Sequence, residues 1–560
     1  MKVRVPMMIQ DPLFGRYENL KSTEGFDIAQ EDFFLDGPVT RRVAVLDFDP
    51  QTGVLLPGVP FRPAPPGRKL GRYQIADEDN LHAPDFIAVS AFATVLKTMY
   101  MYEEADTLGR RLAWAFKGPQ LLVLPRAGQW ANAYYERDSH SLQFFYFPHP
   151  ERPGETIYTS LSRDIIAHET AHAILDGIAP HLYDAITPQS LALHEAIADL
   201  TAVLSAFRSG QLRKAVLRQT GGSIQDSTAF NTIAQEFGMA RSPGAESGSL
   251  RSLLNDKTLA DVSRSDPHAL SEVLSGALYT VMVHIHRALR AELAAEEGRT
   301  EYSASGKALW LGGERFKRMI LRALDYLPPG EVSFADYGRA ILAADQASHP
   351  DDDREREWII DEFVRRGMAP DRQALEVETN FPHAALQEVD LDTLVESDWA
   401  AYDFANRNRD LLGIPQGVPF QVEPRLDVSK DYYRRGGQVE MRECLFKVWW
   451  DQSEPNPPGS FFPRRRAISV GTTLAIDWDT RRVRARLTSD HSARPQEQDE
   501  QQADRDAMLH RLADAGLLGL GSLALGPDGR PLRSVVGGQV ADGLMRVRGA
   551  ARMLHIIGEV

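Results

Sequence analysis

The stretch 161–200, LSRDIIAHETAHAILDGIAPHLYDAITPQSLALHEAIADL, constrains the fold more than any other part of the chain. It contains two segments with helical apolar spacing, and the first includes His168-Glu169-Thr170-Ala171-His172. Residues four apart lie one turn above the other on a helix, so both imidazoles face the same way and can share one metal ion. Glu169 lies about 100° round the helix from His168, beside the metal position rather than in it.

The second segment supplies a third ligand. Thr187-Pro188 predicts an N-cap followed by proline at the first helical position. Glu195 and Asp199 again lie four apart, so we expect Glu195 to complete a His₂Glu zinc site. Asp199 would then hydrogen-bond the far nitrogen of a ligand histidine and fix its tautomer.

Two other histidines, His181 and His194, compete for the place of third ligand. The metzincin pattern would need a glycine and a histidine at the third and sixth positions after His172. Leu175 and Ile178 stand there, which excludes that class. With zinc bound, we expect Glu169 to act as the general base toward a water molecule.

Length and composition limit the number of domains, the binding partners and the cellular location that we expect. A chain of 560 residues should contain about three domains. The net charge of −15 gives no basic field to recruit nucleic acid or an anionic membrane. Cys444 is the only cysteine, which excludes an intrachain disulfide. Residues 1–20 hold no apolar run of signal-peptide length. The longest apolar-looking stretch elsewhere, from Leu517 to Leu525, is broken by glycine and too short to span a membrane, so we expect a cytoplasmic protein.

Pattern changes along the chain suggest three parts. Residues 1–78 combine a small β-rich region with a proline-rich linker at 57–69, residues 79–370 form the core around the predicted zinc site, and residues 371–560 form a β-rich C-terminal domain. In that last part, 438–450 and 467–488 predict strands, and the polar run 491–505 predicts a mobile loop. The fold class expected is α+β.

These motifs, over about residues 80–368, resemble the thermolysin type of gluzincin metallopeptidase. The zinc motifs are those quoted above. Asn132-Ala133-Tyr134-Tyr135 is similar to the family's substrate-binding strand, although by itself this aromatic stretch favours a hairpin packed on the core. The resemblance implies two lobes, one mixed and one helical, with zinc in the cleft between them. It also implies that Asn132 and Ala133 bind a peptide or protein substrate.

Further residues take roles only through this resemblance. Tyr183 and His268 match the family's two transition-state donors, and Arg251 matches the arginine bordering an S1′ pocket for apolar side chains. The chain also departs from the family. Glu195 follows His172 by 23 positions, a few more than usual, and Ala206 stands where an acidic calcium ligand is expected, so calcium is not expected to bind.

Three functions therefore follow as alternatives: an endopeptidase or oligopeptidase, an aminopeptidase of the HExxH class, or a non-catalytic zinc-stabilised binding protein. An aminopeptidase should carry a Gly-x-Met-Glu-Asn segment upstream, and the sequence contains none. A scaffold would need neither Glu169, nor Tyr183, nor His268. Hydrolysis of peptide bonds is therefore the function that the sequence favours, while the sequence does not predict an oligomeric state.

Overall fold

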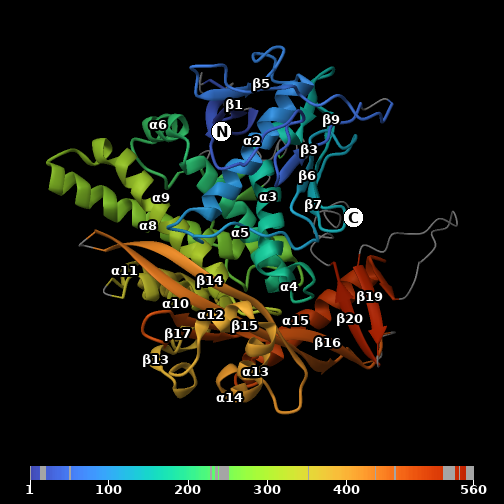
Figure 1. The fold of residues 1–560 in the computed structure, drawn as a ribbon, viewed down its shortest axis with the longest axis vertical. Coiled ribbons are helices and arrows are strands. Elements are labelled where there is room, and N and C mark those ends of the chain that lie inside the picture. The colour runs from blue at the N-terminus through green and yellow to red at the C-terminus, as the bar shows by residue number, and fades with distance from the viewer. Residues whose placement is uncertain are drawn as a thin grey trace.

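The computed structural model describes residues 2–12, 21–49, 52–226, 230–233, 238, 251–350, 352–434, 437–458, 462–520, 536–541 and 543–549. Helices make up 42% of the chain and strands 24%, in several sheets, which agrees with the predicted α+β class. Figure 1 places the N-terminal strands at one end of the long axis and the strands after residue 379 at the other. Between them lie α3 (Arg163–Ile178) and α5 (Pro188–Phe207).

Two four-stranded sheets form the N-terminal end. The first has the order β2-β1-β5-β4 and consists of β1 (Lys2–Met8), β2 (Thr23–Ile28), β4 (Phe61–Arg62) and β5 (Leu70–Tyr73). The second has the order β3-β6-β8-β7 and consists of β3 (Val43–Val45), β6 (Leu121–Leu124), β7 (Ala133–Glu136) and β8 (Ser141–Phe144). Helix α2 (Pro84–Glu103) packs against β1, and α3 packs against β7. The proline-rich stretch predicted as a linker contains β4, which pairs with β5.

Short elements connect this end to the helices. They are β9 (Tyr146–Pro148), β10 (Thr156–Tyr158), the 3₁₀ turn η1 (Thr159–Leu161), β11 (Thr232–Ile233) and β12 (Arg251–Ser252). The main helical layer contains α4 (Pro180–Tyr183), α6 (Gly210–Gln219), α8 (Pro267–Glu297), α9 (Glu301–Tyr326), α10 (Phe334–Ser348) and α11 (Arg354–Arg365). Helix α5 lies at the centre of this layer, in contact with α3, α8 and α9.

Helix α5 is largely apolar and is buried on every side. Among the described residues, it is the one helix with the length and hydropathy of a membrane span, and all of it is buried in the protein. A helix that is apolar all round and covered by neighbouring helices is a core helix. The sequence therefore places Glu195 and Asp199 on an element that must bury them.

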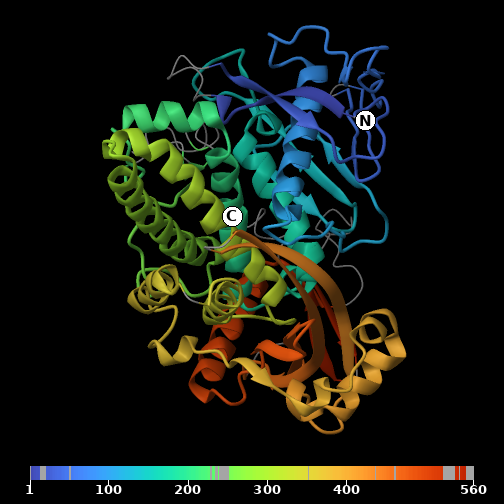
Figure 2. The ribbon, with the colours of Figure 1, turned by 60° about the vertical axis from the view of Figure 1, so that its left-hand side comes forward.

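The C-terminal part contains an eight-stranded sheet with the order β13-β17-β16-β20-β19-β18, to which β15 adds on β16 and β14 on β15. Its strands are β13 (Thr379–Pro382), β14 (Phe420–Arg434), β15 (Gly437–Pro455), β16 (Arg465–Asp477), β17 (Arg482–Thr488), β18 (Leu518–Leu520), β19 (Val536–Ala541) and β20 (Leu544–Arg548). The strands predicted at 438–450 and 467–488 are thus confirmed. Figure 2 shows the long, curved β14 and β15 running next to the helical layer.

Helices accompany this sheet, and one of them corrects a prediction. They are α12 (Leu391–Glu396), α13 (Asp398–Arg407), α14 (Arg409–Leu412) and α15 (Pro495–Asp514), with 3₁₀ turns η2 (Gln373–Leu375) and η3 (Ala384–Leu386). The polar run 491–505, predicted as a mobile loop, enters α15, which contacts α5. Three polar residues of α15 are buried, namely Gln501, Asp504 and Arg505. The buried apolar side chains of α15, Met508, Leu509 and Leu512, all follow residue 505, so apolar periodicity could not reveal the helix within the polar run 491–505.

Packing joins the three predicted parts. One continuous apolar core runs from Val3 to Val547 and includes side chains of all three. A second core lies within residues 386–483, where α12 to α14 cover the C-terminal sheet. The division at residues 78 and 370 remains a prediction, but the helices that carry the candidate site share their core with the C-terminal part.

Candidate metal centre

Helices α3 and α5 bring the three predicted ligands together. The Nε2 atoms of His168 and His172 lie 3.0 Å apart. Glu195 Oε2 lies 3.5 Å from His168 Nε2, and Glu195 Oε1 lies 3.4 Å from His172 Nε2. All three side chains are at most 5% exposed. Two imidazoles and one carboxylate therefore converge on one buried point from two helices.

This arrangement fits a zinc ion. Donor atoms of a tetrahedral zinc site, with bonds of about 2.1 Å, lie roughly 3.4 Å from one another. The three distances above are close to that value, and imidazole and carboxylate are both ordinary zinc donors. Donor atoms of His168, Glu169 and His172 also lie within 4.8 Å of one another, which puts the Glu169 carboxylate beside the same point.

Each ligand imidazole is oriented through its other nitrogen. His168 Nδ1 lies 2.9 Å from Asp199 Oδ1, as the four-residue spacing of Glu195 and Asp199 predicts. His172 Nδ1 lies 2.5 Å from Nδ1 of His194, which is fully buried. The two rings of this second pair stack, with their centroids 4.7 Å apart. Both Nε2 atoms are consequently presented to the shared point.

The electrostatics of the centre favour a cation. Burial alone would lower the pKa of His168, but the hydrogen bonds and charges of Asp199 and Glu195 raise it to about 10. Burial would raise the pKa of Glu195, yet the neighbouring His172, His168 and His268 hold it well below its ordinary value. Without a metal ion, a protonated His168 balances part of the charge of the two buried carboxylates; a divalent cation bound between the imidazoles would supply that positive charge instead.

Helix α3 can take this position because residue 177 is glycine. A Cβ atom at Gly177 would lie 2.0 Å from the carbonyl oxygen of Ala113, well inside van der Waals contact. The C-terminal turn of α3 therefore packs directly on the backbone of the 113 loop. Glu169, about two turns earlier, accepts a hydrogen bond from the backbone nitrogen of Tyr135 at 3.1 Å. This bond ties the predicted base to strand β7.

Two residues implied by the family resemblance lie near the centre. His268 stands in the first turn of α8, where Asp266 caps the helix, and its Nε2 lies 3.8 Å from Glu195 Oε2. Its side chain is 33% exposed, so it can meet a substrate. Tyr183 ends α4 and is buried, with its ring 6.2 Å from that of His194 and 5.7 Å from that of Tyr135.

Of the three predicted substrate-binding residues, the structure describes Asn132 and Ala133 in full but only the backbone of Arg251. Ala133 begins β7, which stands last in the sheet order within the described ranges. Asn132 precedes it and accepts a hydrogen bond from the Ala133 nitrogen through its side-chain oxygen at 2.8 Å. The backbone of Arg251 pairs with Ile233 in the β11–β12 ribbon, whereas its side chain lies outside the described part of the chain.

The competing third ligands have other surroundings. The ring of His181 packs against Trp449 of β15 at 4.8 Å, and burial lowers its pKa to about 4. His194 contacts His172 through Nδ1, the atom on the far side of that ring. The geometry therefore favours Glu195 over both histidines as the residue that faces the two Nε2 atoms.

The sequence did not predict a group of ion pairs and hydrogen bonds beside the centre, which Arg137 forms with two aspartates. Arg137, next after β7, bonds Asp176 of α3 and also Asp184, 2.8 Å away, and its guanidinium lies 4.4 Å from the ring centre of Tyr183. Tyr135 donates to the same Asp176 at 2.8 Å. Asp176 follows His172 by four residues, so the helical spacing that found the ligands could also have found this anchor.

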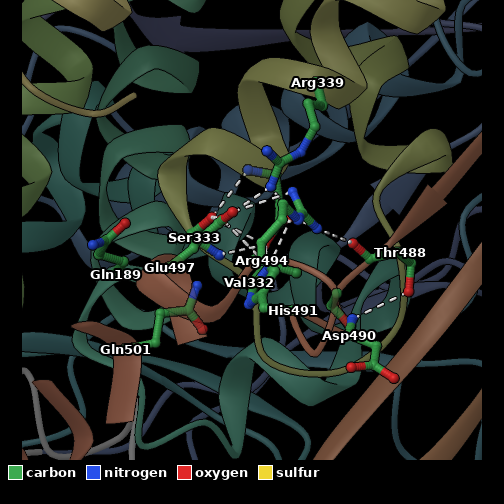
Figure 3. Close-up of polar contacts among 12 residues, drawn as sticks. Gln189, Val332, Ser333, Arg339, Thr488, Asp490, His491, Arg494, Glu497 and Gln501 are labelled. Carbon is green, nitrogen blue, oxygen red and sulfur yellow. Dashed lines mark hydrogen bonds and ion pairs between the residues drawn. The ribbon is translucent and has the colours of Figure 1, made fainter. Parts of the chain in front are cut away.

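Among the described residues, two other acidic clusters resemble metal sites, but basic side chains lie within both. Asp336, His491 and Glu497 lie together next to Arg339 and Arg494. Figure 3 shows His491 and Glu497 beside these two arginines. The other cluster consists of Glu104, Asp106 and Glu314, with Lys317 bonded to all three. Their negative charge is balanced from within the protein, so both are ion-pair networks between elements.

No family model matches the chain, and no curated protein matches it. The chemistry of the centre is therefore the basis for assigning a function.

Proposed function

We propose that this protein is a zinc-dependent peptidase with a thermolysin-like core, hydrolysing internal bonds of peptides or proteins. The observation that carries the proposal is the mutual spacing of His168, His172 and Glu195, at 3.0 to 3.5 Å between donor atoms, with the Glu169 carboxylate beside them. In the thermolysin-like arrangement, the sheet with β7 and the helices around α5 would form the two sides of the cleft.

His168, His172 and Glu195 would hold the zinc ion, which when bound supplies a Lewis acid that lowers the pKa of a coordinated water to about 7. Glu169 would take the proton from the attacking water and pass it to the leaving amine. Its bond to the Tyr135 nitrogen keeps that carboxylate at the substrate side of α3. General acid–base catalysis of this kind contributes about 10²–10⁴-fold.

The remaining residues would act on the substrate itself. His268, partly exposed at the start of α8, would donate a hydrogen bond to the oxyanion that develops on the scissile carbonyl, and Tyr183 would be the second donor. Strand β7 would align an extended peptide through main-chain hydrogen bonds, with Asn132 and Ala133 at its start.

The test separates metal binding from proton transfer. Glu195→Ala removes a ligand, so it should lose most of the zinc together with the activity. Glu169→Gln keeps the ligand set, so it should bind zinc near one per chain while kcat falls by at least about 10²–10⁴-fold. Metal content by mass spectrometry, measured beside turnover of a peptide library, checks both variants. Near wild-type turnover by Glu169→Gln would refute the peptidase mechanism, and full zinc in Glu195→Ala would refute the ligand set.

A further inference from the structure

Helix α15, in the C-terminal part, contacts the segment that leads into α8. Arg511 Nη1 donates to the carbonyl oxygen of Ser265 at 2.6 Å, and Arg511 Nη2 lies 3.7 Å from Asp266 Oδ2. Seven positions earlier on α15, Asp504 Oδ1 lies 2.8 Å from Arg264 Nε. Residues seven apart lie on the same face of a helix, so these two side chains hold the segment along about 10 Å of α15.

The segment held by α15 includes the N-cap of the helix that carries His268. Asp266 Oδ1 accepts hydrogen bonds from the backbone nitrogens of His268 and Ala269 at 3.1 and 3.3 Å, while Oδ2 of the same carboxylate faces Arg511. Pro267 stands at the first helical position, where its ring fixes φ at about −65°. The guanidinium of Arg511 is therefore linked to the backbone of His268 through one carboxylate.

The same helix also holds the start of α5. Arg505, which is buried in α15, donates to the Thr187 hydroxyl at 3.1 Å. It also donates to both carboxylate oxygens of Glu454 in β15, at 2.7 and 2.8 Å. Helix α5 carries Glu195, whose Oε2 lies 3.8 Å from His268 Nε2. Helix α15 thus contacts the N-terminal ends of the two helices that bring Glu195 and His268 together.

We propose that α15 sets the position of His268 at the candidate metal centre, with Arg511 as a positioning residue that acts through Asp266. The catalytic role of His268 rests on the proposed function, whereas the ordering of the first turn of α8 by Arg511 does not. Because His268 would donate to the oxyanion, a displacement of about 1 Å would weaken a bond that exists only in the transition state. The C-terminal part would in this way contribute to turnover.

The experiment changes this contact in the full-length protein, with the variants Arg511→Met, Arg511→Lys and His268→Ala. Arg511→Met removes the guanidinium, whereas Arg511→Lys keeps a charged donor for the Ser265 carbonyl. The matched control is Arg407→Met, because Arg407 is a 75% exposed arginine of α13 that pairs with Asp403 of its own helix. For each protein we would measure the zinc content, kcat and KM with a peptide substrate, and hydrogen exchange at the amides of residues 268 and 269.

In Arg511→Met we expect kcat to fall about 10–100-fold with KM and zinc content unchanged, because losing an interaction made only in the transition state lowers kcat and kcat/KM equally. Arg511→Lys should recover most of this loss. Combining Arg511→Met with His268→Ala should lower kcat no further than His268→Ala alone, since the arginine acts through the histidine. Exchange at residues 268 and 269 should rise about fivefold in Arg511→Met and match wild type in the control.

Turnover by Arg511→Met equal to that of the control, or losses that multiply in the double variant, would overturn the role of Arg511 and leave the proposed peptidase function standing. Loss of zinc from Arg511→Met would overturn it too, because the effect would then be on the whole centre. If the wild type hydrolyses no peptide, the proposed function is refuted and hydrogen exchange decides alone. Faster exchange in Arg511→Met than in the control would then support the contact through Asp266, and equal exchange would overturn it.

Discussion

At the scale of single residues, the two ligand histidines are held differently. Asp199 faces Nδ1 of His168 with a carboxylate, the usual partner of a metal-bound imidazole. His172 instead faces a second imidazole, that of His194. One of the two Nδ1 atoms must donate and the other must accept, so the tautomer of His194 fixes that of His172. His194 is therefore a positioning residue for the second ligand.

Replacing His194 should weaken the metal site without removing it. In His194→Phe the ring volume stays but the contact with His172 Nδ1 is lost, so we expect zinc affinity to fall by about 10–100-fold. The matched control is His181→Phe, whose ring packs on Trp449 and should leave zinc affinity unchanged. Competition with a zinc chelator of known affinity measures both. Equal affinity in the two variants would show that His194 does not orient His172.

A second residue-scale prediction concerns pH. Lys447 is buried in β15 and donates to the Leu327 carbonyl at 2.8 Å. Burial, opposed by Asp325 and reinforced by Arg110 and Lys430, lowers its pKa to about 7. Between about pH 7 and 10 the unfolded chain therefore keeps a proton that the folded protein has released, so folding stability rises with pH across this range.

The methionine variant isolates this effect, because Lys447→Met carries no charge in either state. The free energy of unfolding of wild type minus that of Lys447→Met should increase from pH 7 to 9, by at most about 1.4 kcal/mol per pH unit. Urea unfolding of both proteins at pH 7, 8 and 9 gives the difference. A constant difference would mean that Lys447 stays protonated in the folded protein.

At the scale of elements, the helix that carries Glu195 is anchored from outside itself. Thr187 was predicted as its N-cap, but the Thr187 side chain makes no cap; its hydroxyl donates to Glu331 Oε2 at 2.5 Å. The same oxygen accepts from the backbone nitrogens of Ile186 and Thr187 at 3.2 and 2.8 Å. Arg505 of α15 donates to the Thr187 hydroxyl at 3.1 Å. Thr187 thus stands at the N-cap position as predicted, while the Glu331 carboxylate fixes the backbone just before α5 through the nitrogens of Ile186 and Thr187.

Removing this carboxylate should destabilise the fold. Glu331→Ala leaves three buried donors without their acceptor, and we expect a loss of about 2–3 kcal/mol in the free energy of unfolding. Glu331→Gln keeps an acceptor oxygen at that position and should lose clearly less. Chemical denaturation compares the two variants with wild type. Equal losses would indicate that the charge of Glu331, rather than its hydrogen bonds, stabilises the start of α5.

These contacts show which features the sequence could predict. Four-residue spacing on a helix is a local property, and it correctly paired His168 with His172 and Glu195 with Asp199 on α3 and α5. The capping of Thr187 could not be predicted in the same way, because Glu331 lies 144 positions further along the chain.

Helix α15 was missed for a related reason. Its buried Arg505 bonds Glu454, and its buried Asp504 pairs with Arg264, both from distant segments. Such ion pairs allow polar side chains to be buried without any apolar periodicity in the sequence. The spacing of residues along a helix therefore predicted the candidate ligands. The contacts that hold the helices in place could not be predicted in this way, because they join residues that are far apart in the sequence.

At the scale of the whole molecule, the C-terminal part braces the centre rather than lying apart from it. The segment before α10 links both: Glu331 accepts from the start of α5, and its own nitrogen donates to Ser469 of β16. His181, beside the centre, packs on Trp449 of β15. Residues 371–560 therefore share in holding the candidate site, and their removal would expose the core that runs from Val3 to Val547.

Calcium should add little to this whole-molecule stability. Ala206, where the family resemblance implies an acidic calcium ligand, is fully buried in α5. Asp164, four residues before His168, is the acid that the family resemblance would match to a calcium ligand; it accepts from Gln10 Nε2 with both oxygens, at 2.7 and 2.8 Å. The other two acidic clusters described are balanced by arginine and lysine side chains.

Thermal melts in millimolar calcium and in a calcium-selective chelator should therefore agree within about 1 °C. A specific site present at about 100 times its Kd would add roughly 2.7 kcal/mol, which for a chain of 560 residues corresponds to a Tm shift of about 2 °C. Asp164→Asn provides the matched control, because its amide can still bond Gln10 but is a much weaker calcium ligand. A calcium-dependent rise in Tm that disappears in Asp164→Asn would establish a calcium site at the N-terminal turn of α3 and refute the prediction.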